Sequence, residues 1–113
     1  MSLERELAYS ARDTYAVSPG HTLVIPRRHV ADFFELTPDE INTCMELIIE
    51  ERKLLDEEFQ PDGYNIGVNV GLAAGQSIFH VHIHIIPRYE GDVENPQGGV
   101  RHVLPKKAHY QRK

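Results

Sequence analysis

The sequence predicts an α+β domain: a mostly antiparallel β-sheet covered on one face by one long helix, with a short helix beside it. Three observations predict this class. Apolar and amphipathic stretches follow in the order strand, strand, helix, strand, strand. The last two strands are joined by six residues, too few for a parallel crossover, so they form a hairpin. The length of 113 residues suits one core, so we expect a single domain over residues 1–113.

Two strands are expected before the long helix. The segment 6–13 alternates apolar with polar or small residues, as a strand does. The pair Pro19–Gly20 marks a turn, and the apolar segment 21–26 follows as a short buried strand that ends at a proline. Residues 29–36 are expected to form about one helical turn.

The segment "TPDE" (37–40) predicts the start of the long helix. Thr37 can cap it, Pro38 suits the first helical position, and Glu40 can complete a capping box. Apolar residues at spacings of three, four and seven predict its buried face: Ile41, Met45, Ile48, Leu55 and Phe59. The helix is expected to end near Phe59, before Pro61.

The second half of the chain predicts the remaining strands. Residues 64–70 form a strand with Ile66, Val68 and Val70 on one side. Residues 71–76 form a loop of small residues, and 77–87 form the strongest strand. The tail, 88–113, is rich in glycine, proline and basic residues and is expected to be irregular.

Composition excludes several classes of function. The net charge is −5 and the isoelectric point is near 5.8, which argues against a nucleic-acid-binding surface. The single cysteine, Cys44, cannot form an internal disulfide, so we expect a reducing, cytoplasmic compartment. The sequence shows neither a membrane span nor a signal-peptide pattern, so no membrane partner is expected.

The stretch "FHVHIHIIPR" (79–88) carries three histidines at alternate positions. Side chains two residues apart in a strand share one face of the sheet. We therefore expect His80, His82 and His84 to share one face. Three apolar residues are expected on the opposite face, towards the helix: Val81, Ile83 and Ile85.

Four interpretations of these histidines compete. In the first, they are unrelated surface or core residues, and in the second they bind a catalytic zinc ion, as His-x-His pairs can. In the third, one of them attacks phosphorus as a nucleophile. In the fourth, they belong to a module that binds nucleotides without catalysing a reaction. The nucleophile interpretation requires donors around the phosphoryl oxygens. The loop 69–77 suits that role, because its small residues let backbone N–H groups converge on an anion, and Gln76 and Ser77 add side-chain donors.

These residues resemble the histidine-triad superfamily of nucleotide hydrolases and transferases. "HVHIHII" fits its His-φ-His-φ-His-φ-φ signature, "SPGHTLVIPRRHV" (18–30) is similar to its Pro-Gly-His strand, and "GQS" before the triad is typical. The resemblance runs from about Glu6 to Pro105. The tail segment 91–105 resembles bacterial and archaeal members of the fragile-histidine-triad branch, which cleave diadenosine polyphosphates.

The resemblance implies a role for each matching position. His82 matches the nucleophile that attacks the α-phosphate and becomes nucleotidylated, so that water then releases a nucleoside monophosphate. The other matching catalytic histidines are His80, His84 and His21. The matching substrate-binding residues are Asp13, which falls at the ribose position, and Asn69, Gly75, Gln76 and Ser77 around the phosphates and leaving group. From the residues alone, Asp13 could equally stabilise its own turn, and Asn69 could close the hairpin.

The expected activity is therefore hydrolysis of a diadenosine polyphosphate, with phosphoramidate hydrolysis as the main alternative. No metal site is expected in the protein; a divalent cation such as Mg²⁺ would bind with the substrate phosphates. The resemblance also implies a homodimer. Many relatives begin with a Cys-x-x-Cys segment that this sequence does not show, so a structural zinc has no cysteine pair to bind here.

The remaining histidines and charged residues are expected to have structural or solvent-exposed roles. The histidines outside the triad pattern are His29, His102 and His109. The arginines at the strand ends are Arg27, Arg28 and Arg88, which are expected to be solvated strand-end charges more often than phosphate contacts. The acidic residues of the helix, Glu50–Glu51 and 56–58, are expected to form a solvated face.

Overall fold

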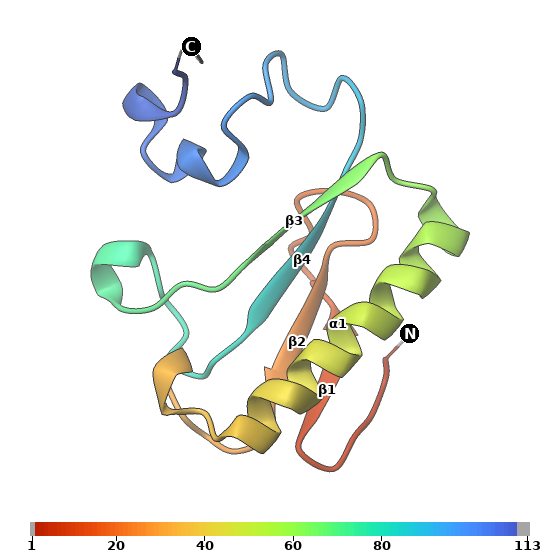
Figure 1. Cartoon of the computed structure of the whole chain (residues 1–113), viewed down its shortest axis with the longest axis vertical. Coiled ribbons are helices and arrows are strands. Elements are labelled where there is room, and N and C mark those ends of the chain that lie inside the picture. Colours follow the sequence, from red (N-terminus) through yellow and green to blue (C-terminus); the bar gives the residue numbers. More distant parts are fainter. Residues whose placement is uncertain (1, 111–113) are drawn as a thin grey trace.

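A computed structural model describes residues 2–110 and has the expected α+β architecture. Four strands form one antiparallel sheet in the order β1-β2-β4-β3. Their bounds are Ala8–Arg12 (β1), Thr22–Pro26 (β2), Gly63–Gly67 (β3) and Ile83–Arg88 (β4). The long helix α1 (Pro38–Phe59) crosses one face of the sheet (Figure 1). No helix within residues 2–110 has both the length and the apolar character needed to span a bilayer.

Helix α1 begins and ends where the sequence predicts. Thr37 Oγ1 accepts a hydrogen bond from the Glu40 backbone N–H (3.1 Å), and Glu40 Oε1 accepts one from the Thr37 N–H (2.8 Å). Arg28 also bonds both carboxylate oxygens of Glu40, at 3.0 and 2.9 Å. This guanidinium, with the Thr37 N–H, lowers the pKa of Glu40 to about 2. The capping box thus also ties the segment after β2 to the helix.

The buried face of α1 matches the predicted face except at Met45, which is 49% exposed. Ile48 and Leu55 are buried as expected, and Ile41 and Phe59 pack against the core. The full set of buried helix residues is Glu40, Cys44, Leu47, Ile48, Glu51 and Leu55. The apolar pattern missed the two glutamates in this set, because glutamate is usually exposed.

Glu51 corrects the expectation of a fully solvated acidic run. Its side chain is completely buried, and it accepts hydrogen bonds from Ser10 Oγ (2.5 Å) and from Arg12 (3.1 Å) on β1. Arg12 also donates to Thr22 Oγ1 on β2 (2.8 Å). A buried carboxylate needs such partners, and here they join α1 to two strands.

The two predicted C-terminal strands are shorter than expected. β3 ends at Gly67 instead of residue 70, and β4 begins at Ile83 instead of residue 77. The carbonyl of Pro26, at the end of β2, accepts a hydrogen bond from the His80 ring (2.7 Å). It therefore makes a side-chain contact in place of a further backbone bond between β2 and β4. The triad therefore begins in an irregular segment and only its last histidine lies in a regular strand.

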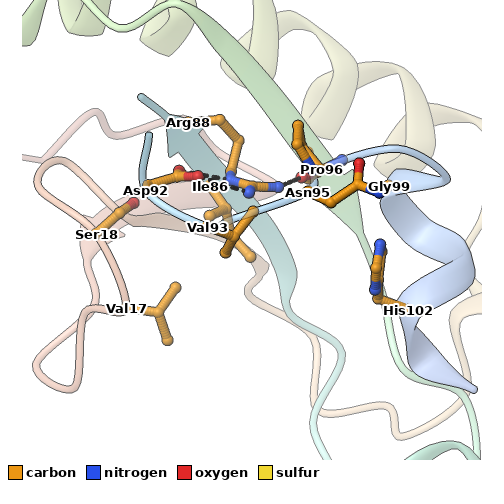
Figure 2. Close-up of a pocket in the computed structure, with 11 residues that line it drawn as sticks. Val17, Ser18, Ile86, Arg88, Asp92, Val93, Asn95, Pro96, Gly99 and His102 are labelled. Atoms are coloured by element: carbon orange, nitrogen blue, oxygen red, sulfur yellow. Dashed lines mark hydrogen bonds and ion pairs between the residues drawn. The ribbon is translucent and has the colours of Figure 1, made fainter. Parts of the chain in front are cut away.

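The tail predicted to be irregular folds into two short 3-10 turns, Gly99–Val103 and Pro105–Lys107, beyond the β3–β4 end of the sheet (Figure 1). Arg88 on β4 binds both carboxylate oxygens of Asp92 at 2.8 Å and also donates to Asn65 (Figure 2). Arg101 donates to the carbonyls of Ala108 and Lys107 at 3.0 and 2.8 Å and so closes the tail on itself. The contacts of Arg88 with Asp92 and of Arg101 with the tail carbonyls therefore hold the tail in place.

The corrected helix face gives a stability prediction. Leu47→Ala should lower the free energy of unfolding by about 2–5 kcal/mol, because Leu47 is completely buried in the core. Met45→Ala, the matched control on the predicted but exposed face, should change it by about 0.5 kcal/mol or less. Urea unfolding followed by circular dichroism measures both. A larger loss for Met45→Ala than for Leu47→Ala would contradict the packing described here.

Candidate active site

The three triad histidines line one cavity on the face of the sheet opposite α1. The register pairs Leu23 of β2 with His84 of β4, and Val24 with Ile83. Val24 and Ile83 are buried beneath the helix, so Leu23 and His84 face the other way. The cavity has a volume of about 480 Å³. Most of the predicted site residues line it: Asp13, Asn69, Gly75, Ser77, His80, His82 and His84.

The apolar residues between the histidines fix their direction. Val81, Ile83 and Ile85 are 1%, 6% and 0% exposed, as the alternation predicts. The Val81 N–H also donates to the Val30 carbonyl at 2.8 Å, which holds the segment before β4. Each buried apolar side chain thereby turns the histidine next to it towards the cavity.

The contact of His82 with its own backbone determines its tautomer. Nδ1 of His82 lies 2.9 Å from the carbonyl oxygen of His80. A carbonyl can only accept a hydrogen bond, so in the neutral ring Nδ1 carries the proton and Nε2 keeps a free lone pair. His82 thus has the form that a nitrogen nucleophile requires.

His80 is held by two neighbours, one of which the sequence did not indicate. Its Nε2–H donates to the Pro26 carbonyl (2.7 Å), so its Nδ1 is an acceptor, and Nδ1 of His29 lies 3.2 Å from it. The two rings meet edge to face, with centroids 5.1 Å apart. His29 is exposed, as expected, and it also belongs to the surroundings of the triad. The proximity of residues just after β2 to those just before β4 follows from the antiparallel pairing of these strands.

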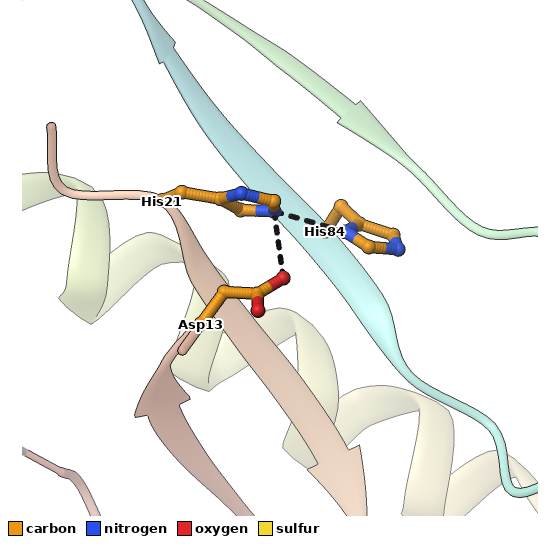
Figure 3. Close-up of side chains that lie close together, drawn as sticks. All are labelled: Asp13, His21 and His84. Atoms are coloured by element: carbon orange, nitrogen blue, oxygen red, sulfur yellow. Dashed lines mark hydrogen bonds and ion pairs between the residues drawn. The ribbon is translucent and has the colours of Figure 1, made fainter. Parts of the chain in front are cut away.

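His21 lies at the start of β2 behind a turn that only glycine fits. Gly20 has φ +88°, and a Cβ there would lie 2.9 Å from the Phe59 ring and 3.0 Å from Leu55. The turn therefore packs directly on the end of α1. His21, the next residue, is 3% exposed and reaches His84 on the adjacent strand, with its Nε2 2.9 Å from His84 Nδ1 (Figure 3).

A chain of hydrogen bonds assigns the tautomers of His21 and His84. The Val17 N–H donates to Nδ1 of His21 (3.1 Å), so Nε2 of His21 carries the proton and donates to Nδ1 of His84. His84 is then left with an N–H at Nε2, on the far side of its ring from His21 (Figure 3). The neutral pair thus presents one hydrogen-bond donor to the cavity.

Burial keeps both of these histidines neutral. Desolvation lowers the pKa of His21, and nearby Asp13 opposes that effect. Desolvation also lowers the pKa of His84, and the neighbouring His82 and His21 lower it further. The neutral state is the one in which His84 Nδ1 can accept from His21.

Asp13 makes the turn contact that was one of its two expected roles. One carboxylate oxygen accepts from the Tyr15 N–H at 2.8 Å, which stabilises the turn after β1. The other lies 3.5 Å from Nε2 of His21. Asp13 also lines the cavity, so its expected contact with a ribose stays a prediction.

The loop before the triad supplies some of the predicted contacts and not others. Asn69, Gly75 and Ser77 line the cavity, and Gly75 has φ +91°, a conformation that favours glycine. Gln76 corrects our expectation, because its side chain is buried and fully used within the fold. Its amide donates to the carbonyls of Ala31 and Ile78 at 2.8 and 3.2 Å, and its Oε1 accepts from the Gly71 N–H at 2.9 Å. Gln76 shapes the loop instead of offering a donor to substrate.

The arginines near the site have structural partners. Arg27 lies over the Tyr9 ring and bonds Glu4, and Arg28 bonds Glu40. Both side chains are exposed, as expected of solvated strand-end charges, and each also has an acidic partner.

Three residues approach closely enough to be considered as metal ligands. The ligand atoms of Asp13, His21 and His84 all lie within 4.8 Å of one another. The hydrogen bonding opposes this use, because Nδ1 of His21 already accepts from the Val17 N–H and Nε2 therefore carries a proton instead of a free lone pair. Cys44 lies in the helix–sheet core, where burial raises the pKa of its thiol to about 11. Within the described residues, the hydrogen bonding of His21 therefore argues against a zinc ion held by Asp13, His21 and His84.

Comparison with known proteins agrees with the geometry. The family model described as "HIT domain" matches residues 1–91. The chain belongs to the HIT domain family. The crystal structure of a HIT family protein from Bacillus anthracis superposes with a TM-score of 0.76 at 39% identity, over 80% of this chain and 64% of that chain. The α+β fold is therefore the fold of the family.

Two relatives carry names that state an activity. A Mycobacterium tuberculosis protein named AP-4-A phosphorylase is 34% identical over 88 residues, which are 77% of this chain and 45% of that protein. A Schizosaccharomyces pombe protein named bis(5'-nucleosyl)-tetraphosphatase [asymmetrical] is 40% identical over 76 residues, which are 67% of this chain and 42% of that protein. With the Bacillus anthracis protein, the chain spans between 42% and 64% of the length of these three proteins.

The lowered pKa values of His21 and His84 predict a loss of stability on acidification. Since both folded-state pKa values lie below the ordinary 6.5, the unfolded chain takes up these protons first as the pH falls below about 6.5. The free energy of unfolding should therefore fall from about pH 6.5 down to the lowered pKa values. Urea titrations between pH 7.5 and 5.5 measure this. His84→Asn, which cannot take up a proton, should show a shallower dependence; an equally steep one would contradict the assignment.

Proposed function

We propose that this chain is a nucleotide hydrolase that cleaves a diadenosine polyphosphate at the α-phosphate through a covalent nucleotidyl-histidine. The observation that carries the proposal is the His82 ring, whose Nδ1 is bound to the His80 carbonyl at 2.9 Å and whose Nε2 is free. The relatives named for diadenosine tetraphosphate chemistry support this class of substrate.

In the first step, the lone pair of His82 Nε2 attacks the α-phosphorus. A P–N bond forms, and the bond from phosphorus to the bridging oxygen breaks with its electron pair leaving on that oxygen. His84 offers its Nε2–H to a phosphoryl or leaving oxygen, while His21 fixes its ring. Ser77, Asn69 and the loop backbone provide further donors beside the phosphate.

In the second step, water attacks the same phosphorus. The P–N bond breaks, its electron pair returns to His82, and the nucleoside monophosphate leaves. For diadenosine tetraphosphate, the two steps consume one water and give AMP and ATP. Asp13, which lines the cavity near His21 and His84, would bond the ribose hydroxyls of the nucleotide that becomes attached to His82.

Three alternatives remain distinguishable by their products. An adenosine phosphoramidate hydrolase would cleave a P–N bond in its substrate faster than an anhydride. A non-catalytic module would bind nucleotide without forming an adduct. A phosphorylase, the activity named for the Mycobacterium tuberculosis relative, would transfer the nucleotidyl group to inorganic phosphate and give ADP in place of AMP.

We also propose that the protein acts as a homodimer, as its family resemblance implies. In the described part of the chain, β3 pairs with β4 alone and forms one edge of the sheet, and Ile66 on that strand is 48% exposed. An edge strand of this kind is open to pairing with a second chain.

The proposal that no metal is held by the protein gives a direct prediction. Protein dialysed against a chelator should contain far less than one metal ion per chain by mass spectrometry of the elements. Its activity should return fully when Mg²⁺ is added with the substrate, since the cation would bind to the substrate phosphates. Activity that returns only with zinc, bound at one ion per chain, would instead support the zinc-hydrolase alternative.

Removal of the nucleophile tests the proposed mechanism. His82→Ala should lower kcat/KM for diadenosine tetraphosphate by roughly 10⁴-fold or more, as the loss of a nucleophile does in other enzymes. His109→Ala, at an exposed histidine outside the cavity, is the matched control and should leave turnover essentially unchanged. Rapid acid quenching should trap a nucleotidyl adduct on wild-type His82. Unchanged turnover by His82→Ala, or an adduct on another residue, would refute the assignment.

A further inference from the structure

The strand pairing that positions His84 stops before it reaches His80. The register of β2 with β4 ends at the pair Val24–Ile83. His80 therefore lies outside the ladder, in a segment without regular strand structure. The segment after β2 runs beside this segment and contacts it in other ways (Figure 1).

Two consecutive residues after β2 make these contacts. Nδ1 of His29 lies 3.2 Å from Nδ1 of His80. The carbonyl of the next residue, Val30, accepts a hydrogen bond from the Val81 N–H at 2.8 Å. The Val30 contact uses backbone atoms, which any residue type provides. The His29 contact, in contrast, requires a side chain with an N–H group.

We propose that His29 is a positioning residue for the attack on phosphorus, and that it acts through His80 on the nucleophile His82. The inference rests on the proposed function, and it assigns a role to a histidine outside the His-φ-His-φ-His pattern. His29 is exposed and does not line the histidine cavity. It therefore acts through its neighbour instead of on the substrate.

The hydrogen bonds of His80 give the contact between the two rings a direction. Nε2–H of His80 donates to the Pro26 carbonyl at 2.7 Å, so in the neutral ring its Nδ1 is an acceptor. Nδ1 of His29 then carries the proton that His80 accepts. Both ring nitrogens of His80 thus have partners within the protein, and the ring is held at two points.

The position of the His80 ring matters because the backbone of the same residue holds the nucleophile. The His80 carbonyl accepts the hydrogen bond from Nδ1 of His82 at 2.9 Å. Loss of the His29 contact would leave the His80 ring with one of its two anchors, and its carbonyl would be less firmly directed at His82. A misplacement of about 1 Å at the reacting groups can cost on the order of a hundredfold in rate.

Strand β2 thus has a histidine just beyond each of its ends that supports a member of the triad. His21, directly before β2, donates to His84, and His29, shortly after β2, donates to His80. The proposed nucleophile lies between the two supported histidines. The supports differ in burial, since His21 is 3% exposed and His29 is at the surface. A substitution at His29 can therefore remove its contact without opening the core.

Kinetics with diadenosine tetraphosphate test the positioning role. His29→Leu removes the N–H group and should lower kcat by roughly tenfold or more, with KM changed by less than about twofold, because the contact orients the nucleophile and does not touch substrate. His29→Asn, whose side-chain amide can donate from the place of Nδ1, should keep kcat within about threefold of the wild type. His109→Leu makes the same change at an exposed histidine outside the cavity, and this matched control should leave kcat unchanged.

A second measurement does not depend on turnover. Long-range ¹H–¹⁵N NMR at about pH 8, above the ordinary pKa of imidazole, distinguishes the two tautomers of a neutral histidine ring. In the wild type, the proton should lie on Nδ1 of His29, on Nε2 of His80 and on Nδ1 of His82. In His29→Leu, the His82 ring should give a signal averaged over both tautomers, and His29→Asn should restore the single form.

The outcomes separate the two proposals. If the wild type does not turn over the dinucleotide, the proposed function is wrong, and the His82 signal of His29→Leu still decides whether His29 positions that ring. If His29→Leu keeps the wild-type kcat, or if His29→Asn is as slow as His29→Leu, His29 has no positioning role. A raised KM with unchanged kcat would place His29 on the substrate and overturn the inference. A proton on Nε2 of wild-type His29 would also overturn it, even where a variant does not fold.

Discussion

The hydrogen bond from His82 Nδ1 to the His80 carbonyl is the contact on which the chemistry of this site depends. It places the proton on one nitrogen and leaves the other free. Its acceptor, His80, is the last residue of a bend over residues 78–80. The next residue, Val81, is buried and donates to the Val30 carbonyl, and the regular strand β4 begins only at Ile83.

The opposite face of the sheet supports this arrangement through polar contacts as well as apolar ones. Glu51 joins α1 to β1, and Arg12 extends the network to Thr22, the residue after His21. Gly20 brings the turn before His21 against Phe59, at the end of the helix. The position of His21 is therefore fixed from the helix side, although its ring acts on the other side of the sheet. Residues 20–22 thus connect the packing on α1 to the position of the His21 ring, which contacts His84.

Much of the fold could be predicted from the sequence because local signals carry it. The capping box at Thr37, the bounds of α1 and the alternation of Val81, Ile83 and Ile85 depend on nearest neighbours and on burial alone, and the structure confirms them. The predicted face of α1 was wrong at Met45 and Glu51. A sequence alone does not show the partners on β1 that allow Glu51 to be buried. Gln76 was misjudged for the same reason, because its partner at Ala31 lies 45 residues away. The contact of His29 with His80, 51 residues away, was likewise not visible in the sequence.

The burial of His21 and His84 favours the neutral form of both rings. In water, the pH and the ordinary pKa of imidazole would set how far each of the three rings is protonated. Here desolvation lowers the pKa of His84, and the nearby rings add to that effect. His84 therefore keeps its single proton at Nε2, directed away from His21, and its Nδ1 is occupied as an acceptor.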